Sequence, residues 1–94
     1  MKEEAKIEAA VCKYAKGKGF YVRKFKSTSQ RGVPDRLFIS PTGEVFFVEF
    51  KAPGKKPTAL QQREMNEIKK RGVCTYCVDS TECGKRIIYF KSPK

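Results

Sequence analysis

The chain has 94 residues, with 21 Lys and Arg against 10 Asp and Glu, which gives a formal net charge of +11. A chain of this length is expected to fold as one small domain, residues 1–94, with a single core and no room for a second domain. The charge favours a polyanionic partner, nucleic acid above all, and the absence of histidine excludes catalysis by an imidazole base or a histidine-held metal.

The positive charge is unevenly distributed. From Ala9 to Pro34 there are seven Lys and Arg and no acidic residue. A solvated basic face is the plain explanation of such a stretch. A nucleic-acid-binding surface is the functional one, and its affinity should fall steeply with salt.

The four cysteines occur in a sequence with no recognisable signal peptide and no apolar run near the ~20 residues of a membrane span. We therefore expect neither secretion nor membrane insertion, and a reducing cytoplasm is the default compartment. Cys74, Cys77 and Cys83 could form a sulfur-only zinc site, but the same segment also fits an ordinary buried strand.

Residues Glu3 to Lys16 are predicted to form a helix, followed by Gly17 and Gly19. Its apolar stripe consists of Ile7, Ala10, Val11 and Tyr14. Glu8 borders this stripe, so its carboxylate is expected to reach the rim of a sheet packed against the helix.

Residues 20–25 have the composition of a strand, and the basic, hydroxyl-rich segment 26–32 follows it. Such groups suit contacts with phosphate oxygens, although a plain polar turn would look similar. A second basic loop spans residues 52–57, where proline and glycine exclude a helix. The candidate DNA-binding residues in and beside these loops are Lys24, Lys26, Ser27, Ser29, Arg31, Lys55 and Lys56.

Two short apolar runs, 36–39 and 45–48, are separated by the loop Pro41-Thr42-Gly43, with glycine where a left-handed conformation is needed. This pattern predicts a β-hairpin. With Ser40 and Glu44 flanking the loop, antiparallel pairing places Asp35 opposite Glu49 and Leu37 opposite Phe47.

Directly opposed residues share a face, with Cβ atoms about 4.5–5.5 Å apart, so Asp35 and Glu49 would repel unless a cation lies between them. Lys51 shares their face because side chains alternate along a strand, while Phe46, Val48 and Phe50 line the other, buried face. The hairpin therefore predicts a metal ion held by two carboxylates with a lysine beside them.

A second helix is expected to begin at Thr58 and to close at Lys69-Lys70-Arg71-Gly72. Thr58 and Gln61 fit a capping box, which is a purely structural role for Gln61. Gln61 also shares the helix face of Met65 and Ile68, turned to the sheet, whereas Gln62 points elsewhere.

Residues 73–78 are predicted to form a strand parallel to 45–48, because strand–helix–strand units cross over in this way. Residues 79–85 fit a turn or a short helical segment. Residues 86–90 read as a last strand at a sheet edge, before a frayed terminus.

The motif Pro34-Asp35, thirteen residues, then Glu49-Phe50-Lys51 resembles the signature of the PD-(D/E)xK nuclease superfamily. The longer match, residues 32–35 followed by 48–54, resembles the virus-type replication-repair nuclease (VRR-NUC) branch, in its stand-alone viral type. The resemblance covers nearly the whole chain.

The resemblance implies an α/β fold with the restriction-endonuclease-like core, an αβββαβ mixed sheet flanked by helices. It also implies a homodimeric, Mg²⁺-dependent endonuclease for four-way (Holliday) junctions or other branched DNA in the host-cell cytoplasm, with Mn²⁺ as a substitute ion. The alternatives are a catalytically silent basic DNA-binding module and a flap or general DNA nuclease.

The resemblance also assigns roles to particular residues. Asp35, Glu49 and the backbone carbonyl of Phe50 would bind the metal. Glu8 would complete the site from the first helix, with Glu4 as its competitor one turn earlier. Lys51 would orient or deprotonate the attacking water. Gln61, with Gln62 as the alternative, would position water or the scissile phosphate.

Overall fold

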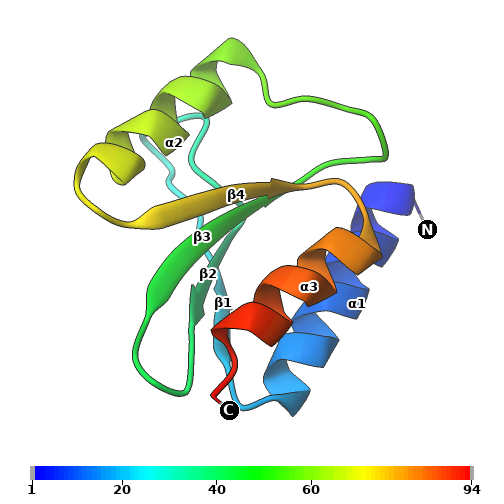
Figure 1. Cartoon of the computed structure of the whole chain (residues 1–94). Coiled ribbons are helices and arrows are strands. Elements are labelled where there is room, and N and C mark those ends of the chain that lie inside the picture. Colours follow the sequence, from blue (N-terminus) through cyan, green and yellow to red (C-terminus); the bar gives the residue numbers. More distant parts are fainter. Residues whose placement is uncertain (1, 94) are drawn as a thin grey trace.

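The computed structural model describes residues 2–93. Figure 1 shows three helices and a four-stranded sheet. In chain order the elements are α1 (Glu3–Gly17), β1 (Tyr21–Lys24), β2 (Arg36–Ile39), β3 (Val45–Phe50), α2 (Ala59–Lys70), β4 (Cys74–Val78) and α3 (Thr81–Lys91). The strand order is β1-β2-β3-β4, antiparallel except for the parallel pair β3 and β4. The predicted αβββαβ mixed sheet is confirmed.

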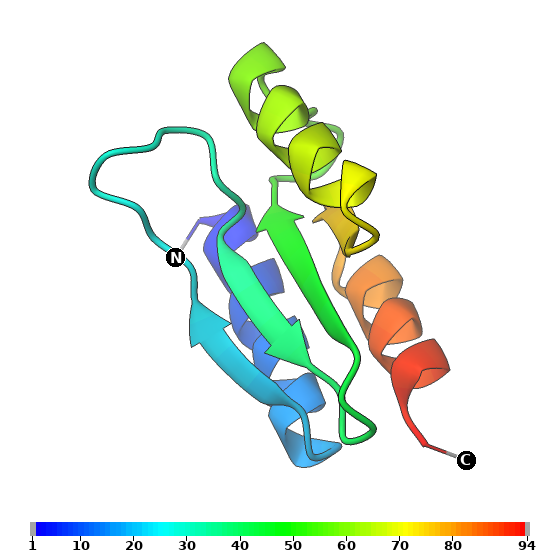
Figure 2. The ribbon, with the colours of Figure 1, turned by 90° about the vertical axis from the view of Figure 1, so that its left-hand side faces the viewer.

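The helices lie on both faces of the sheet. α1 and α3 pack side by side on one face, and α2 lies on the other (Figure 1). Figure 2 views the face that carries α2, with α1 behind the strands and the long β1–β2 loop near the start of α2. The body of a site on the α2 face therefore lies on the other side of the sheet from α1 and α3.

The hairpin register is the predicted one, because Leu37 pairs with Phe47. Its loop is closed by the Ser40 N–H, which donates to the Glu44 carbonyl at 2.8 Å. Gly43 has a φ of +93°, the left-handed conformation expected of it. A tight loop of fixed length thus sets which side chains oppose one another at the far end of the hairpin.

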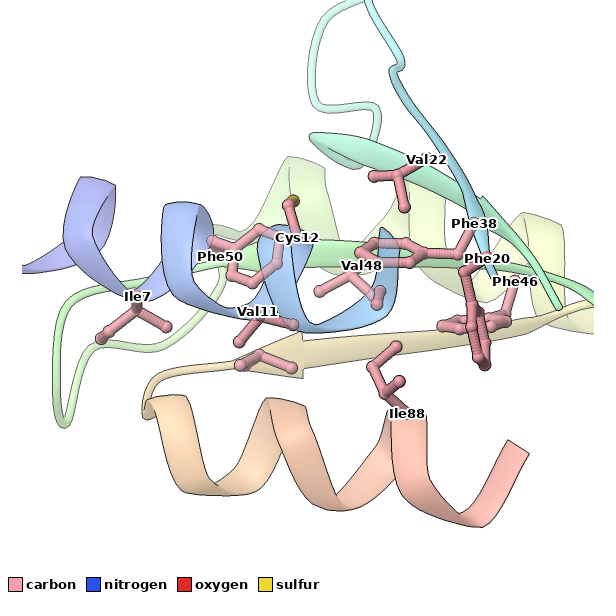
Figure 3. Packing of buried hydrophobic residues seen from close by; sticks show 12 residues of the cluster. Ile7, Val11, Cys12, Phe20, Val22, Phe38, Phe46, Val48, Phe50 and Ile88 are labelled. Atoms are coloured by element: carbon pink, nitrogen blue, oxygen red, sulfur yellow. The ribbon is translucent and has the colours of Figure 1, made fainter. Parts of the chain in front are cut away.

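The core lies between the sheet and the pair α1 and α3, where apolar side chains from all three elements meet (Figure 3). The predicted buried face of β3 is confirmed, since Phe46, Val48 and Phe50 are each at most 2% exposed. α1 and α3 approach closely at Gly84, where an added Cβ would clash with the Val11 side chain.

The predicted last strand is wrong, because residues 86–90 belong to α3. The Ser80 side chain caps this helix by accepting from the Cys83 N–H at 3.1 Å, and Glu82 pairs with Arg86 one turn later. The helix buries Ile88 and leaves Tyr89 and Phe90 exposed. Packing against α1 has overridden the strand preference of the Ile-Ile-Tyr-Phe run.

The remaining boundaries shift by a residue or two. β1 is shorter than predicted at both ends, β4 starts one residue later, and α1 extends to Gly17. Among residues 2–93, no helix has the length and apolar character to cross a membrane.

Candidate active site

Asp35 and Glu49 meet at the end of the hairpin, on the sheet face that carries α2. Asp35 immediately precedes β2, and its Oδ2 accepts a hydrogen bond of 2.9 Å from the Phe50 N–H across the hairpin. Glu49 lies in β3 and is only 3% exposed. The two acids are therefore brought to one place by the register predicted from the loop.

Burial and nearby negative charge disfavour the ionised forms of both acids. The pKa of Glu49 is raised from 4.5 to about 7. Burial is the larger cause and the charge of Asp35 the second, and Lys51 opposes both. Burial also raises the pKa of Asp35, partly offset by the Phe50 N–H, and Glu8 and Glu4 raise it further. The site is thus short of positive charge.

Lys51 and Gln61 both contact Glu49. Lys51 Nζ lies 3.7 Å from Glu49 Oε2, and the Gln61 side-chain amide donates to the same oxygen at 3.0 Å. Gln61 Oε1 meanwhile accepts from the Thr58 N–H, so the predicted capping box is also present. The structural and functional interpretations of Gln61 are compatible, because its amide oxygen caps α2 while its nitrogen reaches Glu49.

Gln62 is exposed and donates to Asn66 Oδ1 within α2. The structure therefore brings Gln61, and not Gln62, to the acid pair.

Glu8 does not contact the acid pair directly. Its Oε2 accepts a hydrogen bond of 2.6 Å from Arg36 Nε, and both side chains are largely buried. Its charge nevertheless raises the pKa of Asp35, and Glu4, exposed one turn earlier, raises the pKa of both Asp35 and Glu49. Both candidate acids of α1 thus lie within electrostatic range of the site, and Glu8 is the one that is fixed in place.

Arg36 is the site residue that sequence reasoning missed. Its position directly after Asp35 was a signal, since alternation sends its side chain to the opposite face, toward the helix that carries Glu8. The sequence does not give the angle at which α1 packs on the sheet, so it could not predict that Arg36 pairs with Glu8.

The donor set fits a hard divalent cation. Glu49 Oε1 is buried and has no hydrogen-bond partner among residues 2–93, which is the situation that a bound cation would resolve. Carboxylate and carbonyl oxygens are the ligands that Mg²⁺ prefers. Within that same part of the chain, no three acidic or cysteine side chains gather as a metal site, so any ion held by Asp35 and Glu49 needs backbone or water oxygens as well.

The predicted DNA-binding residues all lie on exposed loops or at the end of β1. The loop from Phe25 to Pro34 arches beside α2, where Gln30 reaches Glu64 at 3.3 Å (Figure 2). Ser27 Oγ accepts from the Gln30 N–H, so this hydroxyl also shapes the loop. Gly32 packs on Leu60 at a φ of +84°, which leaves no space for a side chain.

The cysteines are free thiols. Cys74 and Cys77 lie in β4 at an odd spacing, so they point to opposite faces of the sheet and do not converge on one ion. Cys77 pairs in register with Glu49. The pKa of its thiol is raised mainly by burial and next by the charge of Glu49.

The mixed sheet with an Asp and a Glu opposed at one end defines an α/β protein of the PD-(D/E)xK class. No protein-family model matches the chain. It is 40% identical over 79 residues to "Putative nuclease p44" of Acyrthosiphon pisum secondary endosymbiont phage 1, covering 84% of this chain and 85% of that protein. A solved structure described as "VRR_NUC domain" superposes with a TM-score of 0.88 at 30% identity, covering 95% of this chain and 97% of the other. The chain belongs to the VRR-NUC family.

Proposed function

We propose that residues 1–94 form one metal-dependent endonuclease domain that hydrolyses phosphodiester bonds in branched DNA. The observation that carries this proposal is the opposition of Asp35 and Glu49, with Lys51 3.7 Å and Gln61 3.0 Å from Glu49 Oε2. The similarity to a phage protein named as a nuclease supports it.

Hydrolysis of a phosphodiester requires an activated water and stabilisation of charge on the phosphoryl oxygens. A divalent cation, when bound, polarises the phosphate and lowers the pKa of water. Asp35, Glu49 and the carbonyl of Phe50 would hold it. Mg²⁺ suits these oxygen donors, and Mn²⁺ is the natural substitute.

The other residues act on the water and on the acids. Lys51 orients or deprotonates the attacking water and stabilises developing negative charge. Gln61 fixes Glu49 Oε2 through its amide and positions water or the scissile phosphate. Glu8, held by Arg36, adds negative charge at the edge of the site and would complete the ligand set through water.

The basic loops would hold the DNA backbone on either side of this site. Lys24, Lys26, Ser27, Ser29 and Arg31 belong to the β1–β2 side, and Lys55 and Lys56 to the loop before α2. Their contacts would be with phosphates, which position the substrate without reading its sequence.

A homodimer would give the protein two sites related by a two-fold axis, matching the symmetry of a four-way junction. The apolar run 87–90 and the exposed parts of the first helix are the candidate pairing surfaces in the sequence. Among the described residues, Phe90 at the end of α3 is the most exposed large apolar side chain, at 72%. We propose that two copies pair through the Phe90 side of α3 in the host-cell cytoplasm.

Cleavage of four-way, flapped, nicked and linear duplex DNA in Mg²⁺, Mn²⁺ and EDTA tests the proposal. Metal-dependent cutting of branched DNA ahead of linear duplex is expected, with Asp35→Asn as the inactive control. Binding without cutting in either metal would instead identify a catalytically silent DNA-binding module. Light scattering that finds a particle of 10.7 kDa at micromolar concentration would refute the dimer.

A further inference from the structure

α1 and α3 pack side by side on the face of the sheet opposite to Asp35 and Glu49 (Figure 1). A groove lined by residues of both helices lies between them. It consists of two hollows of about 480 and 500 Å³ that share Lys18 as a lining residue. The first is lined by Ala10, Lys13, Tyr14, Gly17, Lys18 and Lys85, and the second by Lys18, Tyr89, Ser92 and Pro93. We call this the α1/α3 groove.

Lysine and tyrosine side chains dominate the lining. Lys18 Nζ and Lys85 Nζ lie 5.4 and 5.3 Å from the centre of the half-buried Tyr14 ring, so one aromatic ring holds two ammonium groups beside the groove. Tyr89 is 64% exposed and presents a ring further along. None of the described residues that line the groove is acidic.

This chemistry fits nucleic acid better than a second copy of the chain. An isologous pair formed over the groove would bring two sets of Lys13, Lys18 and Lys85 together with no acid in the lining to compensate, which like-charge repulsion and desolvation disfavour. A polyanion meets the same surface with charges of opposite sign. Phe90, the proposed pairing residue, lies outside the lining.

The tyrosines select the kind of nucleic acid. Proteins that hold single strands combine a positive groove with aromatic rings on which unpaired bases stack. In a duplex the base faces are already covered by their neighbours, so Tyr89 would have no stacking partner along it.

We propose that the α1/α3 groove binds an unpaired nucleic-acid strand, with its phosphates on Lys18 and Lys85 and a base on Tyr89. Strand binding itself does not require cleavage. Its consequence for substrate choice rests on the proposed nuclease function: branched DNA with an unpaired arm, such as a flap or fork, would bind more tightly than a fully paired four-way junction.

Fluorescence anisotropy with labelled oligo(dT) in EDTA tests the groove without cleavage. The variant Lys18→Gln/Lys85→Gln is compared with Lys6→Gln/Lys70→Gln, which loses the same charge from helix positions outside the groove. Losing two phosphate contacts should reduce the salt slope of log K by about 1.4 in the groove variant. Tyr89→Ala should weaken binding about tenfold at every salt concentration.

Equal salt slopes in the two double variants would overturn the proposal, as would undiminished binding by Tyr89→Ala. A drop in particle mass for Lys18→Gln/Lys85→Gln, measured by light scattering, would also overturn it, because the two lysines would then be pairing with acidic side chains of a second copy. The groove variants should cut linear duplex at the wild-type rate. If the groove does not bind a strand, the nuclease proposal is therefore unaffected. If the wild-type protein does not cut DNA in Mg²⁺ or Mn²⁺, the strand-binding result is unaffected.

Discussion

Replacing Glu49 with Gln should stabilise the metal-free protein at alkaline pH and have little effect near pH 5. Glu49 is 3% exposed, and its pKa is raised from 4.5 to about 7 by burial and by Asp35. The folded state therefore holds the Glu49 proton more tightly than the unfolded state does. The stability associated with the neutral carboxyl is fully present below pH ~4.5 and is lost as the pH rises through 7.

The size of the effect follows from the two pKa values. Raising the pKa from 4.5 to about 7 costs about 3 kcal/mol of folding free energy once the pH is well above 7. At pH 5 the same raised pKa costs less than about 1 kcal/mol of folding free energy. The glutamine variant keeps the shape of the side chain and an oxygen for the Gln61 amide, but it carries no charge at either pH.

Thermal unfolding followed by circular dichroism in EDTA, at pH 5 and pH 8.5, measures the difference between the two proteins. For a domain of this size 1 kcal/mol moves Tm by about 4–8 °C, so the variant should melt at least about 10 °C above the wild type at pH 8.5 and close to it at pH 5. Excess Mg²⁺ should reverse the order by stabilising the wild type alone.

A gap in Tm that does not change with pH would refute this reasoning, because it would show that Glu49 is not forced toward its neutral form. Asp35 does not confound the comparison. Its pKa is raised in the same direction, mainly by burial, and it is present in both proteins.

Three further outcomes are expected. Asp35→Ala should abolish cleavage while DNA binding, measured by anisotropy, stays within a few-fold; normal cleavage after metal reconstitution would contradict the assignment. Lys51→Ala should lose at least ~10²-fold in rate with its metal affinity largely kept in calorimetry, and Lys51→Arg should not fully restore the rate. Gly84→Ala should lower the unfolding free energy by about 1–3 kcal/mol in urea titrations, because its Cβ overlaps Val11. Gly17→Ala, with open space around it, is the matched control and should be neutral or stabilising.

The parts of the fold that sequence predicted are those fixed by local rules. Pro41-Thr42-Gly43 set the hairpin length, and that length alone placed Asp35 opposite Glu49. The capping box at Thr58 fixed the start of α2 and thereby the direction of Gln61. In both cases a few adjacent residues determined where a distant side chain lies.

The parts that sequence missed depend on contacts between distant segments. Residues 86–90 have strand-like composition, but they form a helix that packs closely on α1 at Gly84 and Val11 and buries Ile88. The pairing of Glu8 with Arg36 likewise depends on how α1 lies across the sheet. Intrinsic preference is a weak guide where tertiary packing decides.

The buried acids destabilise the fold in which they lie. Glu49 sits in a strand otherwise occupied by apolar side chains, its Oε1 has no hydrogen-bond partner among residues 2–93, and its charge opposes that of Asp35. The hairpin loop and the Gln61 cap nevertheless hold it in place. Two carboxylates that are costly without a cation, held in place by a hairpin register and a helix cap that other residues set, are the arrangement that the proposed metal site requires.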